Sequence, residues 1–188
     1  MKLSKQWVQY ALTAGVLLAV LSGCGAKETT MQDSAAGKSM TTSGPAANKG
    51  EEAPAFSLSD LNGNPVRLAD FNGQRVYVKF WASWCSICLA GLEDLNTLAG
   101  QDNGFQVVTI VTPNYKGEKS AKDFTEWFTK QSYDNLTVLF DEDGTWAKKF
   151  GLRAYPSSYY IGSDGILVKS SPGHAFNDAI TETFKEIL

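Results

Sequence analysis

The chain has 188 residues, of which 43% are hydrophobic and 12% aromatic, so it is long enough to bury one core. Its 17 basic and 20 acidic residues give a net charge of -3 and are mixed along the sequence, without a basic block that could contact phosphates. We therefore expect one folded domain with appendages and no nucleic-acid partner. Three cysteines and one histidine are too few for a disulfide-stapled miniprotein or a metal-rich domain.

Residues 1–23 have the pattern of a signal peptide. Two lysines give a positive start, and residues 11–21 form an apolar run that is short for a permanent membrane-spanning helix. The run ends in Leu-Ser-Gly-Cys, and this tetrapeptide, which closes on Cys24, resembles the bacterial lipobox. The resemblance implies that Cys24 becomes the lipidated first residue after cleavage. The alternative is an ordinary secretory cleavage site with a chance cysteine.

A change of composition separates this leader from the folded part. Residues 24–53 are rich in Gly, Ala, Ser, Thr, Lys and Glu and contain almost no large apolar side chain, which predicts a lipidated, disordered tether. Pro54 then opens a single folded domain, predicted over residues 54–188.

The folded part alternates strands with helices. The expected elements, in chain order, are a small hairpin at 56–58 and 66–68, a buried strand at 75–81, a helix whose leucines recur over 89–98 before Gly100, a strand at 105–112, an amphipathic helix at 120–131 and a strand at 136–140. Such alternation predicts parallel strands with helices on both faces.

The end of the chain has a different pattern. Two strands, at 157–161 and 166–170, flank a Gly-Ser-Asp-Gly turn and predict an antiparallel hairpin, followed by a last helix at 177–188. The expected fold class is therefore α/β, with a mixed central β-sheet flanked by helices on both faces.

A Cys-x-x-Cys motif lies where the buried strand gives way to a helix. The unpaired amides of a helix N-terminus favour an anion, so we expect Cys85 to be the nucleophilic thiolate. Cys88 lies one turn further on and is the natural resolving thiol, so the pair would form a redox-active disulfide that needs no metal or organic cofactor. Half of a zinc site is the first alternative, although only His174 could add a ligand. An inert structural disulfide is the second.

The motif Phe-Trp-Ala-Ser-Trp-Cys-x-x-Cys, which ends at Cys88, resembles the thioredoxin superfamily. Further landmarks at 54–63, 68–73, 144–151, 155–157 and 161–165 resemble the TlpA/ResA branch of extracytoplasmic thioredoxins. The resemblance implies a thioredoxin-like fold with an N-terminal β-hairpin extension. It also implies a cis bond between Tyr155 and Pro156, with the proline facing the cysteines on the substrate face. Beside Cys85, Trp84 is the better candidate for substrate contact, together with Tyr155.

One residue departs from the family pattern. Lys79 occupies the strand position where thioredoxins commonly carry Asp and TlpA-like members Asn. A lysine near the cysteines would favour the Cys85 thiolate and modulate its pKa. The alternative is a lysine that reaches solvent at the strand end. His174, the one histidine, is expected to be a solvated loop residue.

The resemblance implies a function. We expect a monomeric thiol-disulfide oxidoreductase, lipid-anchored to the outer side of the bacterial cell membrane, which receives electrons from a CcdA/DsbD-like membrane protein. Its substrates would be disulfides in surface or secreted proteins, for example a methionine sulfoxide reductase or apocytochrome c. The alternatives are a disulfide-forming oxidant, a peroxidase, and a non-catalytic surface binding module on the same fold. A peroxidase of the peroxiredoxin type would carry a Pro-x-x-x-Thr/Ser-x-x-Cys motif at its reactive cysteine, and this motif is missing before Cys85.

Overall fold

A computed structural model describes residues 47–188 of the protein, so the predicted signal peptide, Cys24 and most of the predicted tether lie outside the described residues. The strands are β1 (Glu51–Glu52), β2 (Ser57–Asp60), β3 (Pro65–Arg67), β4 (Arg75–Phe80), β5 (Phe105–Val111), β6 (Thr137–Phe140), β7 (Ser157–Ile161) and β8 (Ile166–Pro172). The helices are the 3-10 helix η1 (Leu68–Phe71) and the α-helices α1 (Ser86–Ala90), α2 (Leu92–Ala99), α3 (Ala121–Phe128), α4 (Thr145–Lys149) and α5 (Asn177–Lys185).

The eight strands form one mixed sheet in the order β1-β8-β7-β4-β5-β6-β2-β3. The three strands that alternate with helices, β4, β5 and β6, pair in parallel. The C-terminal hairpin of β7 and β8 joins β4 in antiparallel fashion, and the hairpin of β2 and β3 joins β6. The predicted mixed sheet and the N-terminal hairpin are therefore confirmed.

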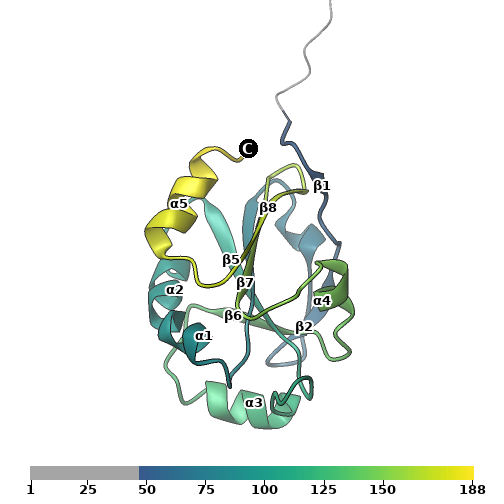
Figure 1. The fold of residues 1–188 in the computed structure, drawn as a ribbon, viewed down its shortest axis with the longest axis vertical. Coiled ribbons are helices and arrows are strands. Elements are labelled where there is room, and N and C mark those ends of the chain that lie inside the picture. Colours follow the sequence, from purple (N-terminus) through teal and green to yellow (C-terminus); the bar gives the residue numbers. More distant parts are fainter. Residues whose placement is uncertain (1–46) are drawn as a thin grey trace, which may run out of the picture. The chain divides into compact units, whose positions relative to one another are not determined.

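The sheet separates two hydrophobic layers. Because successive side chains of a strand point to opposite faces, Tyr77 of β4 and Trp81, which follows the strand, lie in one layer, and Val76, Val78 and Phe80 lie in the other. The first layer packs against α1, α2, α3 and α5, and the second against α4 and η1. Figure 1 shows α2 and α5 on one side of the central strands and α4 on the other.

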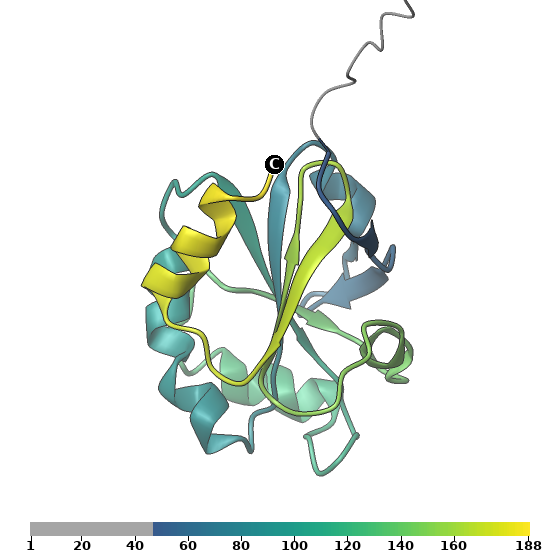
Figure 2. The ribbon, with the colours of Figure 1, turned by 45° about the horizontal axis from the view of Figure 1, so that its top comes forward.

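Ordered structure begins earlier than the tether boundary predicted at residue 53. Glu51 and Glu52 form β1 and pair with β8, as Figure 2 shows for the dark blue segment beside the C-terminal hairpin. Asn48 donates hydrogen bonds to both carboxylate oxygens of Asp164, at 3.0 and 2.9 Å, and accepts one from the backbone N–H of Leu188. Part of the predicted tether is therefore a sheet edge, because its backbone and amide groups find partners distant in sequence.

The helices also differ in detail from the sequence pattern. The single helix predicted after the cysteines is two helices, because α1 ends at Gly91 and α2 starts from the same residue. The short α4 and η1 were not predicted, since four or five residues carry too little periodicity. Among residues 47–188, no helix combines the length and the apolar character needed to cross a membrane.

Candidate active site

Cys85 and Cys88 form a disulfide just after the C-terminal end of β4, with their Cα atoms 5.2 Å apart. Cys85 is the N-cap residue of α1, and its Sγ accepts a hydrogen bond of 3.2 Å from the backbone N–H of Cys88. The two cysteines differ in access, because Cys85 is 8% exposed and Cys88 is fully buried. Only the first sulfur is therefore positioned to meet a large partner.

The surface around the disulfide is apolar. Trp84 is 49% exposed and Ile87, between the cysteines, is 61% exposed. The Trp84 ring meets the Tyr155 ring edge-on, with centroids 5.9 Å apart. The bond from Tyr155 to the buried Pro156 is cis, in agreement with what the resemblance implied. The structure thus brings Trp84 and Tyr155, the two predicted substrate contacts, together beside Cys85.

Lys79 is completely buried, so the alternative of a solvent-reaching lysine is wrong. It lies on β4 between Tyr77 and Trp81 and points to their face of the sheet, which is also the face that packs against the two cysteines. Its Nζ has no hydrogen-bond partner among the described residues. Burial lowers the pKa of Lys79 to about 8, because removal from water disfavours the ammonium form.

His174 lies in the loop before α5, as predicted, and it is half-buried, so it is less solvated than expected. Its Nδ1 is buried and lacks a partner in the described part of the chain. The ring packs directly over Gly91, where an added Cβ would clash with the imidazole. Burial lowers the pKa of His174, and the positive charge of Lys79 lowers it further, while Asp94 acts in the opposite direction. The two basic residues therefore lie close enough to interact.

A buried carboxylate that sequence reasoning missed supports the motif loop. Glu118, in the loop between β5 and α3, accepts hydrogen bonds from the backbone N–H and the hydroxyl of Ser83, each 2.5 Å long. The Lys119 ammonium donates to the Ser83 hydroxyl oxygen at 2.7 Å, and stands over the Trp127 ring. These bonds fix the backbone two residues before Cys85. No local pattern reveals them, because Ser83 and Glu118 are 35 residues apart.

The family follows from comparison with known proteins. The model of the family described as Redoxin matches residues 48–183, which include all eight strands of the sheet and both cysteines of the motif. The chain belongs to the Redoxin family. This match covers well over half of the sequence, and it begins at Asn48, the residue that is hydrogen-bonded to Asp164.

Several known proteins are similar to this Redoxin protein in sequence or in structure. The exposed lipoprotein thioredoxin of Streptococcus pneumoniae has a crystal structure that is 44% identical in sequence, with a TM-score of 0.68, and the match covers 71% of this chain and all of that one. A Haemophilus influenzae protein without an assigned function is 49% identical over 62% of this chain and 76% of its own length. The thiol-disulfide oxidoreductase ResA of Bacillus thuringiensis is 29% identical over 73% and 78%.

This Redoxin protein is therefore a thiol-disulfide oxidoreductase with a thioredoxin-like fold, related to extracytoplasmic proteins of the ResA type. Among residues 47–188, no cluster of three or more His, Cys, Asp or Glu side chains is arranged to hold a metal ion.

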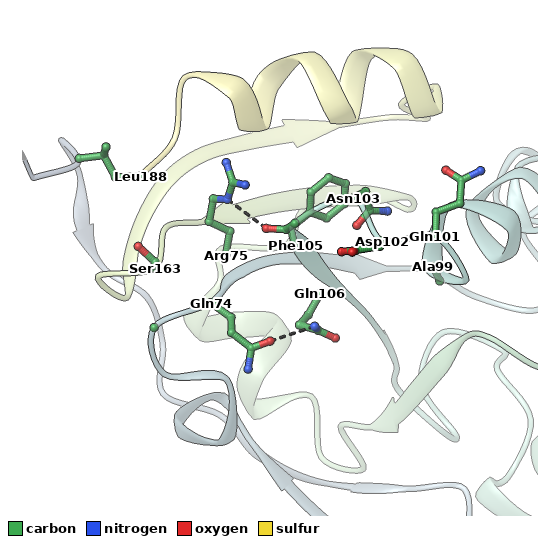
Figure 3. Close-up of a pocket in the computed structure, with 12 residues that line it drawn as sticks. Gln74, Arg75, Ala99, Gln101, Asp102, Asn103, Phe105, Gln106, Ser163 and Leu188 are labelled. Atoms are coloured by element: carbon green, nitrogen blue, oxygen red, sulfur yellow. Dashed lines mark hydrogen bonds between the residues drawn. The ribbon is translucent and has the colours of Figure 1, made fainter.

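A hollow of about 540 Å³ lies at the end of the parallel strands opposite to the cysteines (Figure 3). Its wall includes Gln74 and Arg75, at the start of β4, whereas the cysteines follow the end of this strand. The Arg75 guanidinium is already engaged, since it donates to the carbonyls of Gly104 and Phe184 at 3.1 and 2.7 Å. Gln106 likewise donates to Gln74. These polar groups hold the structure together, and the hollow is separate from the redox site.

Proposed function

We propose that this protein is a membrane-anchored, extracytoplasmic reductant of disulfides in surface or secreted proteins. Cys85 is the nucleophile and Cys88 the resolving thiol. The observation that carries this proposal is the unequal exposure of a disulfide-bonded pair just after β4, where Cys85 retains 8% of its surface and Cys88 none.

The proposed reaction conserves electrons and atoms. In the reduced protein the Cys85 thiolate attacks one sulfur of a substrate disulfide, which forms a mixed disulfide and releases the other sulfur as a thiolate. Cys88 then loses its proton and attacks the Cys85 sulfur, so that the second substrate sulfur leaves as a thiol. The substrate has gained two electrons, and the Cys85–Cys88 pair is oxidised to the disulfide seen in the structure.

The surroundings of the pair suit this sequence of steps. The Cys88 N–H that now points at the Cys85 sulfur would stabilise the thiolate form. Trp84 and Tyr155 offer an apolar contact for the substrate next to Pro156, whose neighbouring backbone is proposed to pair with an extended substrate segment.

The buried Lys79 ammonium supports a second candidate function, that of a disulfide-forming oxidant. On the face of the sheet that packs against the cysteines, a positive charge without a partner favours the thiolate of the reduced pair. Stabilisation of the reduced form raises the reduction potential, and a strongly raised potential is the property of an oxidant. Lys79 is therefore proposed as a modulator of the Cys85 pKa under both functions.

Anchoring and electron supply complete the proposal. We propose that residues 1–23 are a signal peptide and that Cys24 carries the lipid, which the likeness to an exposed lipoprotein thioredoxin supports. A CcdA/DsbD-like membrane protein would reduce the Cys85–Cys88 pair, and a methionine sulfoxide reductase or apocytochrome c is a candidate substrate. If Cys24 is the anchor, Cys24→Ala will move the protein from the membrane fraction to the soluble fraction.

The reduction potential of the Cys85–Cys88 pair separates the two functions. Equilibration with glutathione or dithiothreitol buffers at pH 7, read by thiol alkylation and intact mass, gives the value directly. A potential near or below about -230 mV supports the reductant, and one that approaches about -120 mV supports the oxidant. Absence of a reversible couple would reject both in favour of a binding module.

A further inference from the structure

A small notch lies beside the proposed substrate face. It has a volume of about 40 Å³ and is walled by the loop after β5, the helix α4 and the segment that leads to Pro156. Its lining includes two aromatic residues, Tyr115 and Tyr155, and three basic ones, Lys116, Lys148 and Arg153. The volume admits a group of a few heavy atoms, such as a carboxylate.

The cations of the notch are exposed and form no ion pairs with the residues that the structure describes. Lys116, Lys148 and Arg153 are all exposed, and none of them forms an ion pair within residues 47–188, where the salt bridges are made by other lysines. The Lys116 ammonium stands 5.3 Å from the centre of the Tyr115 ring. Because the whole chain is acidic, with a net charge of -3, this basic group is a local feature.

The neighbouring carboxylates leave the notch positive. Hydrogen bonds from Thr145 are the main cause that lowers the pKa of Asp143, and the positive charge of Lys148 adds to this shift, so Lys148 is partly neutralised. The other two carboxylates are turned to the protein backbone. Asp141 accepts hydrogen bonds from the amides of Trp146 and Ala147, and Glu118 accepts those of Ser83. In the described part of the chain, Lys116 and Arg153 remain without an ion-pair partner.

The notch is tied to the disulfide through direct contacts. Tyr155, which lines the notch, meets the ring of Trp84, the neighbour of Cys85. The loop that carries Tyr115 and Lys116 is fixed to the motif loop by the bonds between Glu118 and Ser83. The notch is therefore held in place next to the path of a substrate, and is formed before the substrate arrives.

We propose that this notch receives an acidic side chain of the substrate, so that the protein favours disulfides flanked by Asp or Glu. The substrate carboxylate would lie between Lys116 and Arg153, while the apolar part of the same segment contacts Trp84 and Ile87. This inference rests on the proposed reductant function, and it names the chemical class of the substrate for that function.

Three disulfide-linked peptides that differ at one flanking position, with Glu, Gln or Lys, test the inference. The kcat/KM of the full chain is measured for each, with dithiothreitol to regenerate the reduced pair. An exposed ion pair contributes up to about 1 kcal/mol, so we expect the Glu peptide to exceed the Gln peptide about fivefold, through KM, and the Lys peptide to be slowest. The preference should weaken in high salt.

A charge reversal at the notch tests whether the substrate carboxylate binds there. Arg153→Glu should abolish or invert the preference among the three peptides, and Lys130→Glu, at an exposed lysine outside the notch, should keep the preference of the natural chain. Equal kcat/KM for the three peptides, or an unchanged preference in Arg153→Glu, would overturn the inference. Failure to reduce any of them would instead reject the reductant function itself.

Discussion

The carboxylate of Glu118 accepts two hydrogen bonds of 2.5 Å from Ser83, one from its backbone N–H and one from its hydroxyl. The contact joins the loop after β5 to the loop that carries Trp84 and Cys85. Glu118 is only 6% exposed, so its carboxylate depends on these partners in place of water. The redox motif is thus held by a residue outside the motif.

Substitution of Glu118 measures the strength of this contact. Glu118→Ala leaves the buried Ser83 N–H without an acceptor, and we expect it to lower the free energy of unfolding by about 1 to 3 kcal/mol. Glu118→Gln keeps an acceptor for that N–H and should lose less. Urea denaturation of the oxidised protein gives both values, and hydrogen exchange at the Ser83 amide should be faster in the alanine variant. Equal stability of all three proteins would show that the contact contributes nothing.

The buried Lys79 gives the stability a characteristic pH dependence. Its pKa is about 8 in the folded protein and near 10.5 in the unfolded chain, so the unfolded state holds more protons between these two pH values. Stability due to this group therefore rises with pH across that window, and the full cost of the buried ammonium is present below pH 8. At 1.36 kcal/mol for each pH unit between the two pKa values, that cost is about 3 kcal/mol.

Lys79→Met removes this cost. We expect the oxidised variant to be more stable than the natural chain at pH 7, with an advantage that shrinks between pH 8 and pH 10.5. Urea denaturation at pH 7, 9 and 10.5 tests this, and Lys130→Met, at an exposed site, serves as the control. An advantage that does not change with pH would mean that Lys79 is not the titrating group.

The packing of His174 on Gly91 predicts that a larger side chain at position 91 destabilises the protein. A methyl group at position 91 would overlap the imidazole ring, so Gly91→Ala should cost about 1 to 3 kcal/mol of stability. The double variant Gly91→Ala/His174→Ala should recover most of that loss, because it removes the clashing ring. A double-mutant cycle with His174→Ala alone isolates the coupling. Strictly additive effects would contradict the contact.

Much of the fold could be predicted from the sequence because the central strands and the C-terminal hairpin have strong apolar and turn patterns. The buried strand predicted at 75–81 is β4, and the Gly-Ser-Asp-Gly turn predicted the hairpin of β7 and β8. The two-residue β1 and the five-residue α4 carry no such pattern, and they form because neighbouring chain segments provide partners. Gly91, read as part of one helix, instead divides two helices.

The features of the site that depend on residues close in sequence could be predicted from the sequence. The position of Cys85 and Cys88 at a strand-to-helix corner followed from the motif, and the cis bond before Pro156 followed from the family resemblance. The contact of Glu118 with Ser83, and that of His174 with Gly91, each join distant parts of the chain, so only the folded structure brings them together.

The central claim is that Cys85 attacks the substrate disulfide and Cys88 resolves the product. Cys88→Ser lacks the resolving thiol, so incubation of the reduced variant with a disulfide peptide should trap a covalent adduct on Cys85, visible by intact mass and removed by dithiothreitol. With Cys24 replaced by alanine in both variants, Cys85→Ser should form no adduct, because the remaining Cys88 sulfur is buried. An adduct on Cys88 in Cys85→Ser, with none in Cys88→Ser, would contradict the assignment of the two roles.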